Sequence, residues 1–150
     1  MTVFDRILAG TLPASFVHQD ELSVSFMDIN PMSRGHVLVV PRQSVDTLDR
    51  LDPPVVAHLW SMAQRIGAAQ RRALGSGAQH LLINDGKVAS QSVPHVHIHV
   101  VPRYGGDTVR TLGRMLWHIA TLTLPRAESR IDRAGLDAQA AAIAAALDGD

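Results

Sequence analysis

The sequence predicts an α+β domain, in which an antiparallel sheet of about five strands packs with one long helix and a C-terminal helix. Apolar segments of strand length occur in adjacent pairs, one before and one after a long segment with helical periodicity. A parallel sheet needs a helical crossover between successive strands, and far fewer such crossovers than strands are predicted here. The sheet is therefore expected to be antiparallel. The chain has 150 residues, of which 46% are hydrophobic and 19% charged, which is enough apolar material for one folded domain.

The first pair of strands is predicted between residues 22 and 40. Residues Leu22–Asp28 alternate between apolar and polar side chains and end before an Asn-Pro turn at 30–31. An extended run, His36–Val40, follows Gly35 and is stopped by a proline. We expect these two strands to form a hairpin.

The long helix is predicted at Pro53–Leu74, because apolar residues recur there every three or four positions. They are Val55, Leu59, Met62, Ile66, Ala69 and Ala73. Asp52 is a suitable N-cap, and Gly75 is a suitable C-terminal stop.

Two further strands and two further helices are predicted after the long helix. The strands are Gln79–Ile83 and Val93–Val101, and a polar loop at 84–92 joins them. One helix is expected at Val109–Leu116. The other is expected at Leu136–Leu147, whose many alanines favour helix.

Charge and composition exclude several classes of protein. Fourteen basic residues balance fourteen acidic ones, so a nucleic-acid partner is not expected. The absence of cysteine excludes disulfides, thiolate zinc sites and a cysteine nucleophile. Asp5 and Arg6 interrupt the segment where a signal peptide would be apolar, and no apolar stretch reaches the roughly 20 residues that cross a bilayer. We therefore expect a cytoplasmic protein with no membrane partner.

Three histidines alternate with aliphatic residues in the segment HVHIHVV at 95–101. Successive side chains on a strand point to opposite faces, so His95, His97 and His99 share one face, and the aliphatic residues between them share the other. This pattern indicates that one face packs in the core while the other carries chemistry.

A metal site is one alternative, since histidines at i and i+2 are well placed to share an ion. The outer pair lies about 13 Å apart at Cα for a rise of about 3.3 Å per residue, so a metal would need other ligands. The sequence contains no glutamate between Glu21 and Glu128 that could be such a ligand. Solvated surface histidines are the second alternative, which the polar loop before the strand disfavours.

Imidazole chemistry favours phosphoryl transfer. A neutral histidine near pH 7 is a nucleophile that needs no deprotonation, and its attack on phosphorus gives a phosphohistidine. His97, the central residue, is the natural nucleophile. His95 and His99 would then donate hydrogen bonds to the phosphoryl oxygens.

The segment at 95–101 resembles the signature of the histidine triad (HIT) family of nucleotide hydrolases and transferases. Five other segments resemble that family in order and spacing: FDRI at 4–7, FMDINP at 26–31, GHVLVVP at 35–41, LINDG at 82–86 and QSV at 91–93. The resemblance covers residues 2–104 and implies a HIT-like fold. It also implies a catalytic domain at 1–104 and a C-terminal extension at 105–150 packed on the same domain.

The resemblance implies roles for the residues nearest the phosphate. His97 resembles the nucleophile, and the backbone carbonyl of His95 would orient its ring. His99 and His36 resemble partners of the phosphate and of the proton network. Asp28 resembles the carboxylate that accepts both ribose hydroxyls, which suits an ionised group with two oxygens.

The resemblance also implies contacts with the base and the leaving group. Gln91 and Ser92 resemble a polar pair that contacts the phosphate or the leaving group, and Asn84 resembles a second sugar or phosphate contact. Four residues resemble the apolar walls of a purine pocket: Phe4, Ile7, Phe26 and Ile29. Each apolar residue alone would usually be a core residue, so it is the whole set that supports a site.

One part of the family pattern is missing. Many bacterial relatives hold a structural zinc with a Cys-x-x-Cys pair, the first triad histidine and a histidine shortly after the Val-Pro-Arg segment. This chain has no cysteine, and Ser44 occupies the place of that last histidine. We therefore expect no metal and no other cofactor.

The resemblance implies an enzyme that releases or transfers a purine nucleoside monophosphate, AMP in particular, through a phosphohistidine. Its substrate would be a dinucleoside polyphosphate or another phosphoanhydride, or an adenosine phosphoramidate. A homodimer is also implied, and the apolar stripe at 55–73 is a surface that two copies could share. Two other interpretations stay open: a non-catalytic nucleotide-binding or interaction module, and a metal-dependent histidine-site protein.

Overall fold

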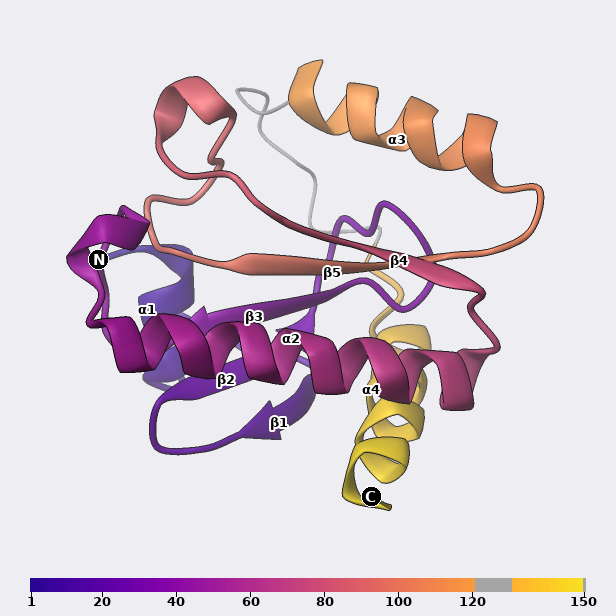
Figure 1. Ribbon diagram of the computed structural model, residues 1–150, viewed down its shortest axis with the longest axis horizontal. Coiled ribbons are helices and arrows are strands. Elements are labelled where there is room, and N and C mark those ends of the chain that lie inside the picture. The colour runs from indigo at the N-terminus through magenta and orange to yellow at the C-terminus, as the bar shows by residue number, and fades with distance from the viewer. Residues whose placement is uncertain (121–130, 150) are drawn as a thin grey trace.

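The computed structural model describes residues 1–120 and 131–149 and contains a five-stranded antiparallel sheet in the order β1-β2-β3-β5-β4 (Figure 1). The strands are β1 Phe16–Gln19, β2 Ser23–Met27, β3 Val37–Pro41, β4 Ala78–Ile83 and β5 Ile98–Arg103. The helices are α1 Val3–Leu8, α2 Pro53–Leu74, α3 Thr108–Ala120 and α4 Arg133–Asp148, with short 3-10 turns at Leu48–Arg50 and Lys87–Ala89. This confirms the predicted α+β fold.

The two faces of the sheet carry different apolar clusters. Helices α2 and α4 cover one face, where α2 packs against β3 and β5 and α4 packs against β1 and β2. Figure 1 shows α2 lying across the sheet, with α4 near its C-terminal half. On the opposite face, Phe4 of α1 packs on residues of β2 and β3: Val24, Phe26, Leu38 and Val40. The sheet therefore separates a large core from a smaller one beneath α1.

Helix α2 has the bounds that its periodicity predicts. Pro53 and Pro54 occupy the first turn, where a missing N–H has no helical partner to lose. Asp52 is the N-cap residue, although its side chain makes no capping hydrogen bond. The helix ends at Gly75, whose φ of 69° is the left-handed conformation typical of a C-cap.

The apolar stripe of α2 is buried inside the chain. Leu59, Met62 and Ile66 are 0%, 2% and 0% exposed, because the sheet and α4 cover them. The expectation that this stripe is available to a second copy is therefore wrong. Periodicity showed that the helix has an apolar face, but it did not show which partner covers that face.

Helix α4 begins three residues earlier than predicted, after an N-terminal cap from Asp132. It turns a regular apolar stripe inward: Leu136, Ala140, Ile143 and Leu147. Ser15 donates a hydrogen bond from Oγ to Asp137 Oδ1 at 2.5 Å, and Gly35 donates from its backbone N–H to Gln139 Oε1 at 2.7 Å. These contacts fix α4 to the segment before β1 and to the turn before β3.

The strand predicted at Val93–Val101 is shorter in the structure, where β5 begins at Ile98. Residues before it bond elsewhere: the backbone N–H of Val96 donates to the carbonyl of Val45 at 2.8 Å, outside the sheet. The predicted alternation is nevertheless confirmed for its apolar half. Val96, Ile98 and Val100 are fully buried in the core beneath α2.

Two elements were not predicted. Strand β1 has four residues, and its register with β2 shifts between Phe16 and His18, so it carries too little alternation to detect. Helix α1 has six residues and begins with a reciprocal capping box between Thr2 and Asp5. Both are short; α1 lines the pocket described below, and β1 forms one edge of the sheet.

Helix α3 is longer than the segment predicted at Val109–Leu116 and leaves apolar side chains in solvent. Val109, Leu112, Leu116 and Trp117 are between 53% and 86% exposed. Among the described residues, no helix combines the length and hydropathy needed to cross a membrane. The cytoplasmic location stays a prediction.

Candidate active site

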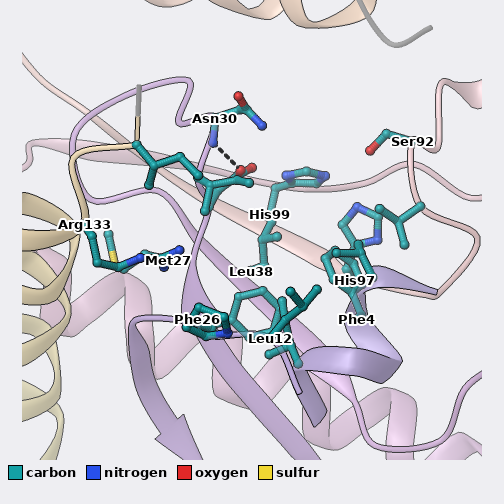
Figure 2. A pocket seen from close by; sticks show the side chains of 18 residues that line it. Phe4, Leu12, Phe26, Met27, Asn30, Leu38, Ser92, His97, His99 and Arg133 are labelled. Atoms are coloured by element: carbon teal, nitrogen blue, oxygen red, sulfur yellow. Dashed lines mark hydrogen bonds between the residues drawn. The ribbon is translucent and has the colours of Figure 1, made fainter. Parts of the chain in front are cut away.

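A pocket of about 670 Å³ opens on the α1 side of the sheet (Figure 2). It lies between α1, the ends of β2 and β5, and the residues at the start of α4. Eight of the predicted site residues line it: Phe4, Ile7, Phe26, Asp28, Ile29, Ser92, His97 and His99. The pocket is therefore apolar on one wall and carries imidazole, hydroxyl and carboxylate groups on the others.

His97 presents one specific nitrogen for chemistry. Its Nδ1 lies 2.7 Å from the backbone carbonyl oxygen of His95. A carbonyl oxygen only accepts, so Nδ1 carries the proton and donates it. In the neutral ring the lone pair is therefore on Nε2, which is the atom a nucleophile needs.

His36 and His99 form a second imidazole pair. The backbone N–H of Met32 donates to Nδ1 of His36 at 3.2 Å, so the neutral His36 ring carries its proton on Nε2. That Nε2 lies 3.0 Å from Nδ1 of His99 and donates to it. The neutral His99 ring then carries its own proton on Nε2. His99 is thus set as a hydrogen-bond donor, 4.8 Å between ring centroids from His97.

Asp28 stands where β2 ends, at the edge of the pocket. One carboxylate oxygen, Oδ1, accepts a hydrogen bond from the backbone N–H of Asn30 at 2.8 Å, drawn as the dashed line in Figure 2. The other oxygen lies 3.5 Å from Nδ1 of His36. The side chain of Asp28 is 10% exposed and borders the cavity. The Asn30 N–H and the His36 ring therefore orient the carboxylate, whose oxygens can still accept hydrogen bonds from a ligand in the pocket.

The apolar wall comes from α1 and β2. Phe4 is the centre of this wall, with its ring edge-on to Phe26 at 5.5 Å between centroids and to His97 at 5.1 Å. Ile7 and Ile29 border the same cavity. This arrangement places an apolar surface beside the imidazole groups, as binding of a flat aromatic base requires.

Four predicted residues do not line the pocket. His95 is fully buried, and its Nε2 donates to the carbonyl of Pro41 at 2.9 Å, so its ring is not free to donate to a phosphoryl oxygen. Gln91 donates to the carbonyl of Asp46 at 2.7 Å, and Asn84 donates to the carbonyl of Ser90 at 3.3 Å. His36 also lies behind the cavity, where it contacts His99.

Several lining residues were not predicted. Leu12, Pro13 and Ala14 line the pocket from the segment after α1, Leu38 from β3, and Arg133 from α4. The apolar residues carry no signal beyond ordinary core composition. Arg133 lies far along the chain from every motif, and only the packing of α4 brings it to the site.

One group of described residues has the composition of a metal site. Ligand atoms of Asp28, His36 and His99 all lie within 4.8 Å of one another. Both nitrogens of His36 and the Nδ1 of His99 already take part in hydrogen bonds, so a metal ion would have to replace that chain of bonds. The contacts favour a proton-sharing network at this position over an ion.

The position at which the family resemblance implies a zinc site has a different donor set here. Nδ1 of His95 lies 3.5 Å from Oδ1 of Asp5. The backbone N–H of Thr2 holds the pKa of Asp5 down at about 2, with help from the Ser44 side chain, the Thr2 side chain and the charge of His95. Two ligand-type side chains and a hydroxyl do not make a zinc site. They form a polar tether between α1 and the histidine segment.

Comparison with known proteins identifies the group to which this fold and pocket belong. The family model described as the HIT domain matches residues 9–106. An uncharacterised HIT-like protein of Methanocaldococcus jannaschii is 36% identical over 107 residues, which are 71% of this chain and 82% of that protein. An adenylylsulfatase of Arabidopsis thaliana is 37% identical over 105 residues, 70% of this chain and 53% of that protein.

Among solved structures, a zinc-bound histidine triad family protein from Mycobacterium smegmatis is similar over the whole fold. The TM-score is 0.76 with 34% sequence identity, and the match covers 98% of this chain and 93% of that one. The similarity therefore extends through the C-terminal segment, beyond the residues that the family model matches.

Proposed function

The chain belongs to the HIT family, and on that premise we propose that it releases or transfers a purine nucleoside monophosphate through a phosphohistidine at His97. Family membership supports a nucleotide-binding, hydrolase-type function in general. The single observation that supports the specific mechanism is the 2.7 Å hydrogen bond from His97 Nδ1 to the His95 carbonyl, because it leaves the Nε2 lone pair available.

In the first step, Nε2 of His97 attacks the α-phosphorus. A bond forms between nitrogen and phosphorus, and the bond from phosphorus to the leaving group breaks. The leaving group departs with the bonding electrons and takes a proton from water. The phosphorylated ring keeps its proton on Nδ1, and the His95 carbonyl stabilises the positive charge that the ring then carries.

In the second step, water attacks the same phosphorus. The nitrogen-phosphorus bond breaks, its electrons return to Nε2, and the nucleoside monophosphate is released together with a proton. Each step inverts the configuration at phosphorus, so the two steps together retain it. His99, with its proton on Nε2, donates to a phosphoryl oxygen as negative charge develops.

The nucleotide itself fits the remaining walls. Asp28 accepts the ribose hydroxyls, and the apolar wall around Phe4 and Phe26 covers one face of the base. AMP is the first nucleotide to test, since the Arabidopsis relative is named an adenylylsulfatase. The leaving group is an anhydride phosphate or an amine, on the Ser92 side of the pocket.

The experiment is incubation of the protein with a panel of adenylated substrates, which includes diadenosine polyphosphates, adenosine phosphoramidate and adenylyl sulfate, followed by measurement of released AMP. Turnover of at least one member is expected. Saturable AMP binding without turnover of any member would favour the alternative of a non-catalytic nucleotide-binding module.

We also propose that two copies associate, through the β4 edge of the sheet. Strand β4 lies at that edge, with one side free of any described strand, and its Leu81 is 41% exposed. The apolar stripe of α2 is covered within the chain, so it does not serve this purpose. Light scattering at micromolar concentration should give the mass of a dimer, and a monomer mass would remove this part of the proposal.

A further inference from the structure

Arg133 is the one lysine or arginine among the described residues that line the pocket. Its Nη1 atom is buried and has no hydrogen-bond partner in the described part of the chain. A guanidinium stays charged at every physiological pH, and a buried donor without an acceptor is costly. An acceptor on a bound ligand would remove that cost.

The position of Arg133 is fixed by the fold. The residue stands at the start of α4, where the Asp132 side chain accepts from the backbone N–H of Gly135 at 3.0 Å. Leu136, in the same turn, is buried in the main core. The backbone of Arg133 therefore stays in place when a ligand enters, and only its side chain has to adjust.

Arg133 lies at the end of the pocket away from the chemistry. Figure 2 shows it beside Met27 on one side of the cavity, with His97 and Ser92 on the other. This inference rests on the proposed function, which places the phosphate at His97 and the ribose at Asp28. The part of the nucleotide that then extends toward Arg133 is the base.

We propose that Arg133 reads the edge of the purine base and favours a 6-oxopurine nucleotide over a 6-aminopurine nucleotide. The guanidinium is a donor-only group with two parallel N–H bonds. Guanine and hypoxanthine present two adjacent acceptors, O6 and N7, which match this fork. Adenine presents N7 beside an amino group, so AMP binds with one acceptor and a donor facing the guanidinium.

The test compares two substrates whose bases differ at position 6 and in the proton on the adjacent N1, the phosphoramidates of inosine and adenosine 5′-monophosphate. Wild-type protein should give a kcat/KM ratio of inosine to adenosine above one. Arg133→Met should lower this ratio about tenfold, chiefly through the KM of the inosine substrate, because a bidentate arginine contact typically discriminates between bases by about that much. Arg133→Lys, which keeps the charge without the fork, should also lower it.

Arg65→Met is the matched control, since Arg65 is an exposed arginine on α2, and it should leave the ratio unchanged. An equal ratio in wild-type protein and in folded Arg133→Met would overturn the inference. If wild-type protein turns over neither substrate, the proposed function fails. The role of Arg133 in base preference is then tested separately by calorimetric Kd values for IMP and AMP. IMP binding should then weaken in Arg133→Met more than AMP binding, and absence of binding by both nucleotides would refute the inference as well.

Discussion

Phe4 meets His97 edge-on, with 5.1 Å between ring centroids and an angle of 80° between the ring planes. The same phenyl ring contacts Phe26 and His95, and it is 6% exposed. Helix α1 therefore shapes the apolar wall and also restricts the ring that carries the proposed nucleophile. Because Phe4 has these other partners, the wall does not depend on the His97 ring for its position.

His97→Ala should abolish turnover and leave nucleotide affinity largely intact. The substitution removes Nε2, whereas Asp28 and the wall around Phe4 remain. Turnover is measured as AMP release, and affinity as the Kd of AMP by calorimetry. His80→Ala, at an exposed histidine on β4, is the control and should keep full activity. Substantial turnover by folded His97→Ala would show that another group attacks phosphorus.

The covalent intermediate should be detectable. Substrate carrying labelled α-phosphate, quenched rapidly in base, should leave label on His97 that is stable in base and lost in acid, as a phosphoramidate bond predicts. The rate should also fall toward acidic pH, because protonation of Nε2 removes the lone pair. If label never attaches to protein, or attaches to another residue, then water attacks phosphorus directly.

Activity should survive prolonged treatment with EDTA. Among the described residues, no third ligand-type side chain groups with Asp5 and His95, and both nitrogens of His36 and the Nδ1 of His99 already take part in hydrogen bonds. AMP release before and after dialysis against EDTA is the measurement, with metal analysis of the same samples. Loss of activity that added zinc restores would favour the metal-dependent interpretation.

Asp5 should make stability depend on pH in the acid range. Its pKa of about 2 lies below the ordinary value of 3.8, so the folded state favours the ionised form. The stabilisation is fully present above about pH 4 and is lost as pH falls through about 2. Asp5→Asn should show a smaller fall in the free energy of unfolding over this range, measured by urea denaturation. Asp49→Asn, at an exposed aspartate, should behave like wild type.

Gly35→Ala should destabilise the fold by about 2 kcal/mol. The residue has a φ of 86°, and an added Cβ would collide with Leu74 and lie 3.3 Å from Pro102 Cγ. Its carbonyl also accepts from Gln70 at 2.9 Å, so the backbone cannot easily turn away. The urea midpoint is the measurement. Gly77→Ala, where an added Cβ meets nothing within 4 Å, should change it little.

The sequence predicted the elements whose pattern is long and regular. Helix α2 and the two strand pairs have enough turns or alternations to be recognised from period alone. The start of β5 at Ile98 is not predictable from the pattern, because alternation at 93–101 is the same whether or not each residue joins the sheet. For that reason the ring of His95 was expected at the phosphate, although it bonds to Pro41.

The pocket was predictable only in part, for a related reason. The pocket residues close to the histidines in the sequence, and those of β2 and α1, lie in segments that resemble motifs of the family. Arg133 reaches the pocket because Leu136 and Ile143 dock α4 on α2, a long-range contact that no local pattern encodes. A residue brought to a site by such a contact is predictable from the sequence only when it belongs to a recognisable motif.

The place of α4 in the chain also affects how the protein is made. Translation proceeds at roughly 5–20 residues per second, so all five strands leave the ribosome some seconds before α4 does. During that interval the face of α2 that α4 later covers is exposed to solvent, and the pocket lacks the wall that carries Arg133. Ligand binding in its final form therefore begins only once α4 has been made and has docked on α2.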